Sequence, residues 1–463
     1  MGGYDYDLII IGSGPGGYVC GIRAAQLGLK AAVIEKDKPG GVCLNMGCIP
    51  SKSLIHLAGL FRGIAGLEGM GLSVDRSRFD YSKVFDKSRK AADTLSRGVQ
   101  YLLKKYGAEL ISGTAAVTGK NEVTVNAARR LTGKNIVIAT GSRPREIPGF
   151  PFDEEKVLSS TGALMLKRLP AKMLILGAGA IGVEFAHILN SFGVEVHIVE
   201  MMDRMLPLED AESVSVLERA FKKRGISISL STKAVSMEEG KNGVKVVLEG
   251  EAGDKKSVDA DQCLVVVGRA PNTEGIGLEK AGITLAKGSI PVGDYYQTAV
   301  PGIFAIGDVI PAPLLAHVAS KEGEIVAEYI AGKSPAPRID PLSIPSAVYT
   351  EPEVASFGLP EWKARESGRN YVTAVCPYRG AGKSVAIERT EGFVKVLLDK
   401  DTREIIGAHV VGEQATELIH ELLLARTAEL LPQDIGDMIH AHPSLSEAVM
   451  EAMRSAEGRS INI

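Results

Sequence analysis

Two cysteines lie five residues apart in the segment GGVCLNMGCIPSK, which spans residues 40–52. In an ideal α-helix, positions five apart have Cα atoms about 8.6 Å apart, which exceeds the ~7 Å limit for a disulfide. A bond between Cys43 and Cys48 therefore requires an irregular turn, which Asn45 and Gly47 can supply. We interpret the two thiols as a redox-active pair.

The residues that follow this pair predict a helix. Pro50 is favoured in a first helical turn, and residues 51–60 form a helix-like stretch. Cys48 would then lie at a helix N-terminus, where the dipole favours a thiolate, and Cys43 would be the thiol free to exchange with a substrate. No further Cys or His cluster nearby completes a four-ligand metal site, so we predict no metal. Two inert buried thiols remain an alternative at this point.

The other three cysteines carry no motif. Cys20, Cys263 and Cys376 are isolated, and we interpret them as small buried hydrophobic residues. Five cysteines in 463 residues is too few and too odd a number for a secreted disulfide scaffold.

A second candidate for chemistry is the segment HAHPSLSE, residues 440–447. His442 precedes a proline, which favours an extended backbone and a ring that projects from a loop. Ser444 and Glu447 fit a capping box, so a helix should start there. Glu447 either only caps this helix or orients the imidazole for acid–base work beside a thiol. His440 is a rival for that role.

Two strand–glycine–helix units can position these groups. Residues 7–17 read DLIIIGSGPGG and residues 173–182 read MLILGAGAIG. A helix-like stretch follows each unit, at 18–27 and 183–192, and a strand then ends at an acid. The glycines and acids are Gly12, Gly14, Gly17 and Glu35 in the first unit, and Gly177, Gly179, Gly182 and Glu200 in the second.

Each of these units has the pattern of a dinucleotide site. The first glycine makes a tight turn, the second lets the backbone approach a pyrophosphate, and the third lets the helix pack on the strand. The helix N-terminus faces the phosphates, and the acid binds a ribose. A single such motif is weak, but two copies with an acid at the same spacing predict two bound dinucleotides. Glu200 stands where a 2′-phosphate would need positive charge, which favours NAD over NADP, although Arg204 follows nearby.

Composition and further segments complete the outline. The chain is 45% hydrophobic and 24% charged with a net charge of −3, which indicates a globular protein of about three domains and no nucleic-acid partner. No apolar run approaches the ~18 residues of a membrane span, and the N-terminus has no targeting pattern. We therefore expect a soluble, cytoplasmic protein. Apolar runs end at glycines in 135–142, 263–272 and 302–309. From about residue 345 the pattern becomes α+β, with strands at 393–399 and 405–412 and helices at 415–429 and 446–455.

These motifs together resemble the flavoprotein disulfide reductases, and within that family the dihydrolipoamide dehydrogenase branch. The resemblance covers essentially the whole chain, and the cysteine segment carries most of its specificity. Val42 and Met46 replace the Thr and Val that are common in the family. The resemblance favours this branch over NADP-dependent glutathione-type reductases, which carry arginines where Glu200 and Met201 stand.

The resemblance implies roles for individual residues. Cys48 is the flavin-proximal thiol, Cys43 is the interchange thiol, Lys52 lies near the flavin and pairs with Glu184, and His442, oriented by Glu447, is the acid–base. The implied FAD contacts are Gly12, Ser13, Gly14, Pro15, Gly16, Gly17, Glu35, Lys36, Gly41, Val42, Cys43, Lys52, Ala115, Thr140, Gly141, Ser142, Asp308, Leu314, Leu315, Ala316 and His317. The implied NAD contacts are Gly177, Gly179, Ala180, Ile181, Gly182, Glu184, Glu200 and Gly268.

The resemblance also implies the architecture and the partners. We expect an α/β protein with two Rossmann-like dinucleotide-binding domains and a C-terminal α+β dimerisation domain. The expected layout is an FAD domain at 1–148 and 271–344, an NAD domain at 149–270 and the interface domain at 345–463. His442 would reach the cysteines of the other subunit of a homodimer, and the substrates would be lipoyl-bearing proteins of 2-oxo acid dehydrogenase or glycine cleavage assemblies. Two alternatives are another NAD(P)H-dependent disulfide reductase and a structural subunit that docks into a multienzyme assembly.

Overall fold

The computed structural model describes residues 3–240 and 243–463, and its first sheet holds the N-terminal strand. Strands β3, β2, β1, β6 and β17 run parallel, and β5 and β4 extend the sheet antiparallel. Residues 8–10 of β1 are fully buried because both faces of the sheet are covered by other parts of the chain. The strands are β1 (Tyr6–Ile11), β2 (Ala31–Glu35), β3 (Glu109–Ser112), β4 (Ala115–Gly119), β5 (Glu122–Val125), β6 (Arg129–Ile138) and β17 (Ile303–Ala305).

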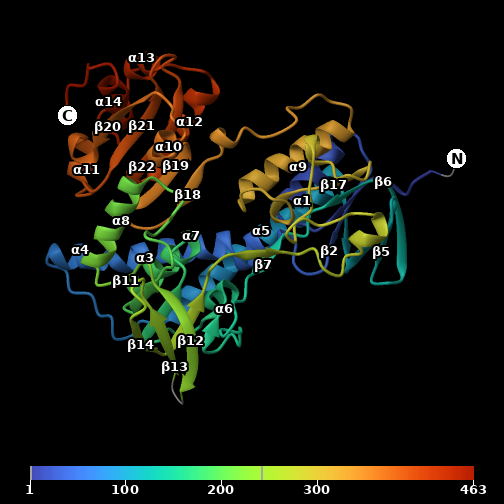
Figure 1. The fold of residues 1–463 in the computed structure, drawn as a ribbon, viewed down its shortest axis with the longest axis horizontal. Coiled ribbons are helices and arrows are strands. Elements are labelled where there is room, and N and C mark those ends of the chain that lie inside the picture. Colours follow the sequence, from blue (N-terminus) through green and yellow to red (C-terminus); the bar gives the residue numbers. More distant parts are fainter. Residues whose placement is uncertain (1–2, 241–242) are drawn as a thin grey trace.

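Helices from distant parts of the chain pack on this sheet. Helix α1 lies against α9, and Gly323 of α9 is so close that a Cβ there would stand 2.5 Å from the Gly16 carbonyl oxygen. The long helix α5 crosses the centre of the molecule (Figure 1) and packs against α3. The helices within residues 15–106, together with the later helix α9, are α1 (Pro15–Gln26), α2 (Gly41–Met46), α3 (Cys48–Arg62), α4 (Ile64–Gly69), α5 (Tyr81–Tyr106) and α9 (Ala316–Ile330).

A second parallel sheet is inserted between β6 and β17 of the first. Its order is β11-β10-β9-β15-β8, and a three-stranded antiparallel sheet, β12-β13-β14, lies beside it. The antiparallel strands β7 (Ser142–Pro144) and β16 (Arg269–Pro271) form the two connections between the first sheet and this inserted part. The remaining elements are β8 (Val157–Leu158), α6 (Ser160–Met165), β9 (Lys172–Leu176), α7 (Ala180–Ser191), β10 (Glu195–Val199), α8 (Ala211–Lys223), β11 (Ser227–Ser229), β12 (Lys233–Gly240), β13 (Gly243–Glu249), β14 (Lys255–Ala260) and β15 (Gln262–Val265).

The C-terminal part forms a five-stranded antiparallel sheet of order β18-β19-β22-β21-β20. It lies at the opposite end of the molecule from the N-terminal sheet (Figure 1). Strands β21 and β22 have the bounds expected from the sequence. The elements are β18 (Ser346–Val348), β19 (Glu353–Gly358), α10 (Glu361–Glu366), β20 (Tyr371–Pro377), α11 (Gly382–Ala386), β21 (Phe393–Asp399), β22 (Ile405–Gly412), α12 (Ala415–Thr427), α13 (Pro432–Gly436) and α14 (Glu447–Ser455).

The helices of the two glycine motifs begin earlier than the sequence pattern indicates. We expected them at 18–27 and 183–192, but α1 begins at Pro15 and α7 at Ala180. In each unit the second glycine is the N-cap, with φ of −62° at Gly14 and −71° at Gly179. The helix N-terminus therefore stands directly behind the glycine turn, which is the arrangement that binds phosphate.

Two other expectations concern burial and membranes. Cys20, Cys263 and Cys376 are fully buried, which confirms them as core residues, and burial raises the pKa of each thiol to about 12. Within the described ranges, no helix combines the length and the apolar character that crossing a bilayer requires.

Candidate active site

The two cysteines of the CLNMGC segment lie at a break between two helices. Cys43 belongs to α2 and Cys48 begins α3, and the break falls at Gly47 (φ −155°, ψ −113°). Asn45 stays helical, and its side-chain amide donates to the carbonyl oxygens of Pro39 (3.1 Å) and Gly41 (2.9 Å). Gly47 alone therefore supplies the irregular turn, while Asn45 anchors the start of α2. Both thiols are free and half-buried.

The two thiols hold their proton unequally. The pKa of Cys48 is lowered to about 7, mainly by the hydrogen bond that Cys43 donates and also by the Lys52 ammonium, against an opposing effect of burial. The pKa of Cys43 is raised, because its proton is held in that hydrogen bond and its side chain is buried beside the Cys48 sulfur. The lowered pKa of Cys48 at a helix N-terminus and the raised pKa of Cys43 favour the thiolate form at Cys48, which is the division that a helix dipole supports.

Lys52 connects the thiol helix to the second glycine unit. Its Nζ lies 3.0 and 2.9 Å from the two carboxylate oxygens of Glu184 on α7. It also stands 4.5 Å above the ring of Tyr349, whose backbone N–H donates to Glu184 (3.1 Å). Glu184 is buried. The ion pair therefore joins three parts of the chain at one place next to the thiols.

The first glycine turn is shaped by close backbone packing. Gly12 has φ +103°, and a Cβ there would stand 2.3 Å from the Ala139 carbonyl oxygen. A Cβ on Gly17 would stand 1.9 Å from the Gly12 carbonyl oxygen. A Cβ on Gly14 would meet nothing within 4 Å. The first and third glycines are thus required by the fold, and the second leaves open space in front of the helix.

The second turn repeats this geometry. Gly177 has φ +107°, and a Cβ there would stand 2.7 Å from the Val266 carbonyl oxygen. A Cβ on Gly182 would stand 2.0 Å from the Gly177 carbonyl oxygen, whereas one on Gly179 would again meet nothing within 4 Å. In both units the open space lies where a pyrophosphate would approach the backbone.

The acids at the strand ends also take equivalent positions. Glu35 accepts hydrogen bonds from the backbone N–H (2.9 Å) and hydroxyl (2.6 Å) of Ser13, the residue after the first glycine. Glu200 accepts the backbone N–H of Ala178 (2.7 Å), the residue after Gly177. Each acid therefore both fixes its glycine turn and stands beside it, as a ribose-binding carboxylate would.

The thiol segment is tied directly to the first glycine turn. The backbone N–H of Gly40 donates to the Ser13 carbonyl (3.0 Å). Gly41 has φ +59°, and a Cβ there would lie 2.8 Å from the Gly14 Cα. The start of α2 therefore packs on the second glycine, so a ligand at this turn would extend toward the cysteines.

A polar cluster lies where the two units join. Asp308 accepts a hydrogen bond from the Ser142 hydroxyl and lies 3.8 Å from the Arg269 Nε. Arg269 also donates to the hydroxyl (2.6 Å) and carbonyl (2.8 Å) of Ser142. The Thr140 hydroxyl donates to the Asn272 carbonyl (2.7 Å). Arg269 and Asn272 were not predicted as site residues. The signal for them is the segment GRAPN, which directly follows an apolar strand as the other site segments do.

The other expected contact residues lie on nearby elements. Leu314 and Leu315 precede α9, which begins at Ala316, and the His317 Nε2 lies 2.9 Å from the Pro345 carbonyl. Ala115 is buried at the start of β4, two residues after Gly113, whose N–H donates to the Glu35 carbonyl. Further expected contacts are Pro15, Gly16, Lys36, Val42, Gly141, Ala180, Ile181 and Gly268, of which Lys36, Val42, Ala180 and Gly268 are exposed.

His442 and Glu447 lie together in the C-terminal part, on a loop and at the start of α14. The His442 Nδ1 is 2.9 Å from Glu447, and 76% of the His442 side chain is exposed. No hydrogen bond or ion pair joins His442 to Cys43 or Cys48 in the part of the chain that the structure describes. The imidazole is oriented by the carboxylate and faces outward.

The capping expectation at this helix was half wrong. Glu447 does accept the backbone N–H of Ser444 (2.8 Å), but the Ser444 hydroxyl is buried and has no hydrogen-bond partner among the described residues, and the helix begins only at Glu447. The carboxylate therefore serves the loop and the imidazole together. The rival His440 is different, because its side chain is only 3% exposed and pairs with Glu421 at 2.8 Å.

Comparisons with known proteins agree with this geometry. A family model described as pyridine nucleotide-disulphide oxidoreductase matches residues 6–323, and one for the dimerisation domain of the same family matches residues 344–453. A dihydrolipoyl dehydrogenase of Bacillus subtilis is 43% identical over 99% of this chain and 97% of its own length. The mitochondrial dihydrolipoyl dehydrogenase of Pisum sativum is 39% identical over 100% of this chain and 93% of its own.

Solved structures show the same fold. The crystal structure of LpdA from Mycobacterium tuberculosis matches with a TM-score of 0.89 at 28% identity, covering 96% of this chain and 99% of that one. The HOCl-induced flavoprotein disulfide reductase RclA from Escherichia coli matches with a TM-score of 0.86 at 27% identity, over 96% and 98%. The expected α/β architecture with a C-terminal dimerisation domain is confirmed. The chain belongs to the pyridine nucleotide-disulphide oxidoreductase family.

Proposed function

We propose that this protein is a dihydrolipoyl dehydrogenase, which oxidises protein-bound dihydrolipoyl groups and reduces NAD⁺ to NADH. The observation that carries the proposal is the polarised thiol pair, with Cys48 favoured as thiolate, linked through Lys52 and Glu184 to the second dinucleotide unit. Full-length relatives at about 40% identity bear this name.

The two glycine turns fit FAD in the first unit and NAD in the second. The open space in front of Gly14 and Gly179 admits a pyrophosphate, and Glu35 and Glu200 stand where a ribose would lie. The residues around Asp308, Arg269 and Lys52 would hold the flavin end near the cysteines. When bound, FAD carries the electron pair between the thiol pair and the nicotinamide.

The chain's own groups perform the sulfur chemistry. With Cys43 and Cys48 in the disulfide form, His442 takes a proton from the substrate dithiol, and the resulting thiolate attacks Cys43. This step forms a substrate–Cys43 disulfide, breaks the Cys43–Cys48 bond and leaves Cys48 as thiolate, which Lys52 stabilises. The second substrate sulfur then displaces Cys43 and closes the lipoyl disulfide, and its own proton passes to the departing Cys43 sulfur. The products are the lipoyl disulfide, the Cys43 thiol, the Cys48 thiolate and a protonated His442.

We infer that the site is shared between two copies of the chain. His442 is exposed on the domain that matches the family's dimerisation model and does not contact the cysteines of its own chain. In a homodimer it would stand beside the thiol pair of the second copy, with Glu447 holding its ring.

Three more specific expectations are also part of the proposal: the domain bounds, the partners and the location. The FAD domain would comprise 1–148 and 271–344, the NAD domain 149–270 and the interface domain 345–463. The partners would be lipoyl-bearing proteins of 2-oxo acid dehydrogenase or glycine cleavage assemblies, and the location cytoplasmic. Copurification and identification of the bound lipoyl protein would test the expected partners.

The central experiment measures NAD⁺ reduction by dihydrolipoamide. Cys48→Ser should abolish this activity, and full retention of activity would contradict the proposed thiol mechanism. The shared site is tested by coexpressing a Cys48→Ser chain with a His442→Ala chain, because the mixed dimer contains one intact site. We expect activity in the mixed dimer and none in either parent dimer.

Two further measurements separate the alternatives. Another disulfide reductase of this family would turn over low-molecular-weight disulfides faster than dihydrolipoamide. A purely structural subunit would show no charge-transfer absorbance on anaerobic titration with NADH.

A further inference from the structure

The segment that follows Glu200 encloses the second glycine turn. Glu200 accepts the N–H of Ala178 (2.7 Å), and the backbone N–H of Leu206 donates to the Ala178 carbonyl (2.9 Å). Met202 donates its N–H back to Glu200 (2.9 Å). Both polar groups of the residue after Gly177 are therefore bonded to this one segment, so its position determines the shape of the turn.

The last residues of the same segment contact the C-terminal domain. The Glu209 carboxylate is buried and accepts hydrogen bonds from the hydroxyls of Ser346 and Ser356, each at 2.6 Å. The backbone N–H of Glu361 donates to Asp210 (3.2 Å). Nothing in the geometry of a glycine turn requires such an attachment to another domain.

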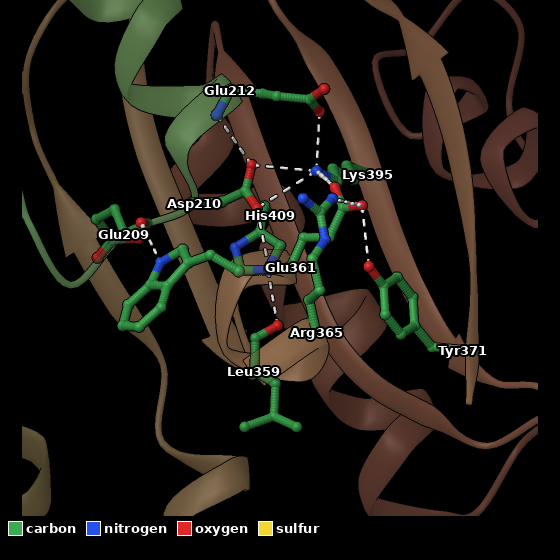
Figure 2. Close-up of polar contacts among 10 residues, drawn as sticks. Glu209, Asp210, Glu212, Leu359, Glu361, Arg365, Tyr371, Lys395 and His409 are labelled. Atoms are coloured by element: carbon green, nitrogen blue, oxygen red, sulfur yellow. Dashed lines mark hydrogen bonds and ion pairs between the residues drawn. The ribbon is translucent and has the colours of Figure 1, made fainter. Parts of the chain in front are cut away.

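A buried lysine of that domain completes the attachment (Figure 2). Lys395, in the centre of β21, is 1% exposed, and its Nζ lies 3.3 Å from both oxygens of Asp210. It also lies 2.8 Å from Glu212 and 2.5 Å from Glu361. Asp210 is 2% exposed. An ammonium has three donors, and here they serve three carboxylates, two of them at the start of α8.

A third contact holds the middle of the segment. The guanidinium of Arg204 lies 5.3 Å from the ring centroid of Trp362, whose indole N–H donates to the Glu209 carbonyl (3.3 Å). The Arg204 Nε is buried without a hydrogen-bond partner in the described part of the chain. The arginine that follows Glu200 is thereby engaged with the C-terminal domain.

We propose that Lys395 is a positioning residue for pyridine-nucleotide binding, acting through Asp210 and segment 200–210 on Glu200 and the second glycine turn. The inference rests on the proposed function in one respect, namely that this unit binds NAD. The C-terminal domain thus has a second task besides association, since it sets the geometry of a site whose expected NAD contacts all lie outside that domain.

The physical reason is that a buried charge cannot be left unpaired. Removing the lysine would leave Asp210 buried beside Glu361 and Glu212, so the start of α8 must move outward to solvate its carboxylates. Segment 200–210 would move with it, because Glu209 and Leu206 connect the two. Cys48 and the first glycine unit do not contact this cluster.

The test compares Lys395→Met with the unmodified holoenzyme in two assays. Calorimetric titration with ADP-ribose reports on the second unit without any redox chemistry. Flavin reduction by dihydrolipoamide under anaerobic conditions reports on the thiol site alone. We expect ADP-ribose affinity to fall by about tenfold and the KM for NAD⁺ to rise similarly, with the rate of flavin reduction unchanged.

Three variants make the result specific. Lys395→Arg should restore affinity because the charge returns. Lys223→Met is the matched control, because Lys223 lies at the exposed end of α8 and its Nζ is 3.7 Å from Glu391. This variant should leave the ADP-ribose affinity, the KM for NAD⁺ and the rate of flavin reduction unchanged. If Lys395→Met does not fold, Asp210→Asn decides instead, because asparagine still caps α8 but lacks the charge.

The outcomes separate this inference from the proposed function. Unchanged ADP-ribose affinity in folded Lys395→Met or Asp210→Asn overturns the inference, as does an equal loss in both assays. If dihydrolipoamide does not reduce the flavin of the unmodified protein, while Lys395→Met still binds ADP-ribose about tenfold more weakly, the proposed function fails and the positioning role stands.

Discussion

The Nζ of Lys52 lies 3.0 and 2.9 Å from the two carboxylate oxygens of Glu184, which joins the helix that begins with Cys48 to the helix behind the second glycine turn. The two charges act on Cys48 in opposite directions. The hydrogen bond from Cys43 lowers the pKa of Cys48 most, and Lys52 lowers it further, whereas Glu184 raises it.

Lys52→Met should therefore raise the pKa of Cys48 above its value of about 7, by about one unit or more. The pH dependence of alkylation of the reduced protein by iodoacetamide measures it. Glu184→Gln should move the midpoint the other way, because the remaining ammonium is then unopposed. Shifts of the same sign in both variants would contradict this account of the pair.

The second and third glycines of each turn should respond differently to a methyl group. Gly179→Ala places its Cβ in open space, so thermal stability should hold while the KM for NAD⁺ rises by about tenfold or more. Gly182→Ala drives its Cβ against the Gly177 carbonyl oxygen and should cost about 1–3 kcal/mol of stability. Calorimetric unfolding and steady-state kinetics distinguish the two effects. Equal stability loss in both variants would show that the open space is not a ligand site.

His442 should matter for only one half of the reaction. In the proposed shared site, its exposed ring, held by Glu447, would serve the dithiol substrate and not the hydride transfer at the nicotinamide. His442→Gln should slow flavin reduction by dihydrolipoamide by about 10²–10⁴-fold and leave flavin reduction by NADH unchanged. Stopped-flow absorbance resolves both rates. Glu447→Gln should show a smaller loss in the same half-reaction, since the ring remains but its orientation is no longer held by a charge.

The local patterns of the sequence predicted the parts of the site that depend on adjacent residues. The spacing of Glu35 and Glu200 from their glycines predicted equivalent positions, because a strand–helix–strand unit returns the acid to its own turn. The Lys52–Glu184 pair spans 132 residues and followed only from the family resemblance. No periodicity relates two elements that meet through tertiary packing.

Lys395 shows the limit more clearly. In the strand FVKVLLD its alternation with apolar residues is typical of a side chain that faces solvent. Strand β21 is paired on both sides, however, and residues 394–398 are all buried, so the lysine points toward Asp210 and Glu212 at the start of α8. Its partner Asp210 is 185 residues earlier, and only the arrangement of the two domains brings them together.

Stability should depend on pH through Glu322, a buried residue of α9. Its carboxylate accepts the backbone N–H of Gly307 (2.6 Å), beside Asp308, and burial raises its pKa from 4.5 to about 7. Because the folded-state pKa is the higher one, the folded protein retains the proton between these values. The stability that this proton contributes is complete below pH 4.5 and is lost as the pH rises through about 7.

Glu322→Gln should therefore remove this dependence. Glutamine can still accept the Gly307 N–H but never ionises, so the variant should gain stability relative to the unmodified protein above pH 7, by at most about 3 kcal/mol. Below pH 4.5 the two proteins should unfold at the same denaturant concentration. Urea unfolding of both holoproteins across this pH range measures the difference. A gap that is constant from acid to alkaline pH would mean that Glu322 has the same pKa in the folded and unfolded states, and that the hydrogen bond from Gly307 offsets the effect of its burial.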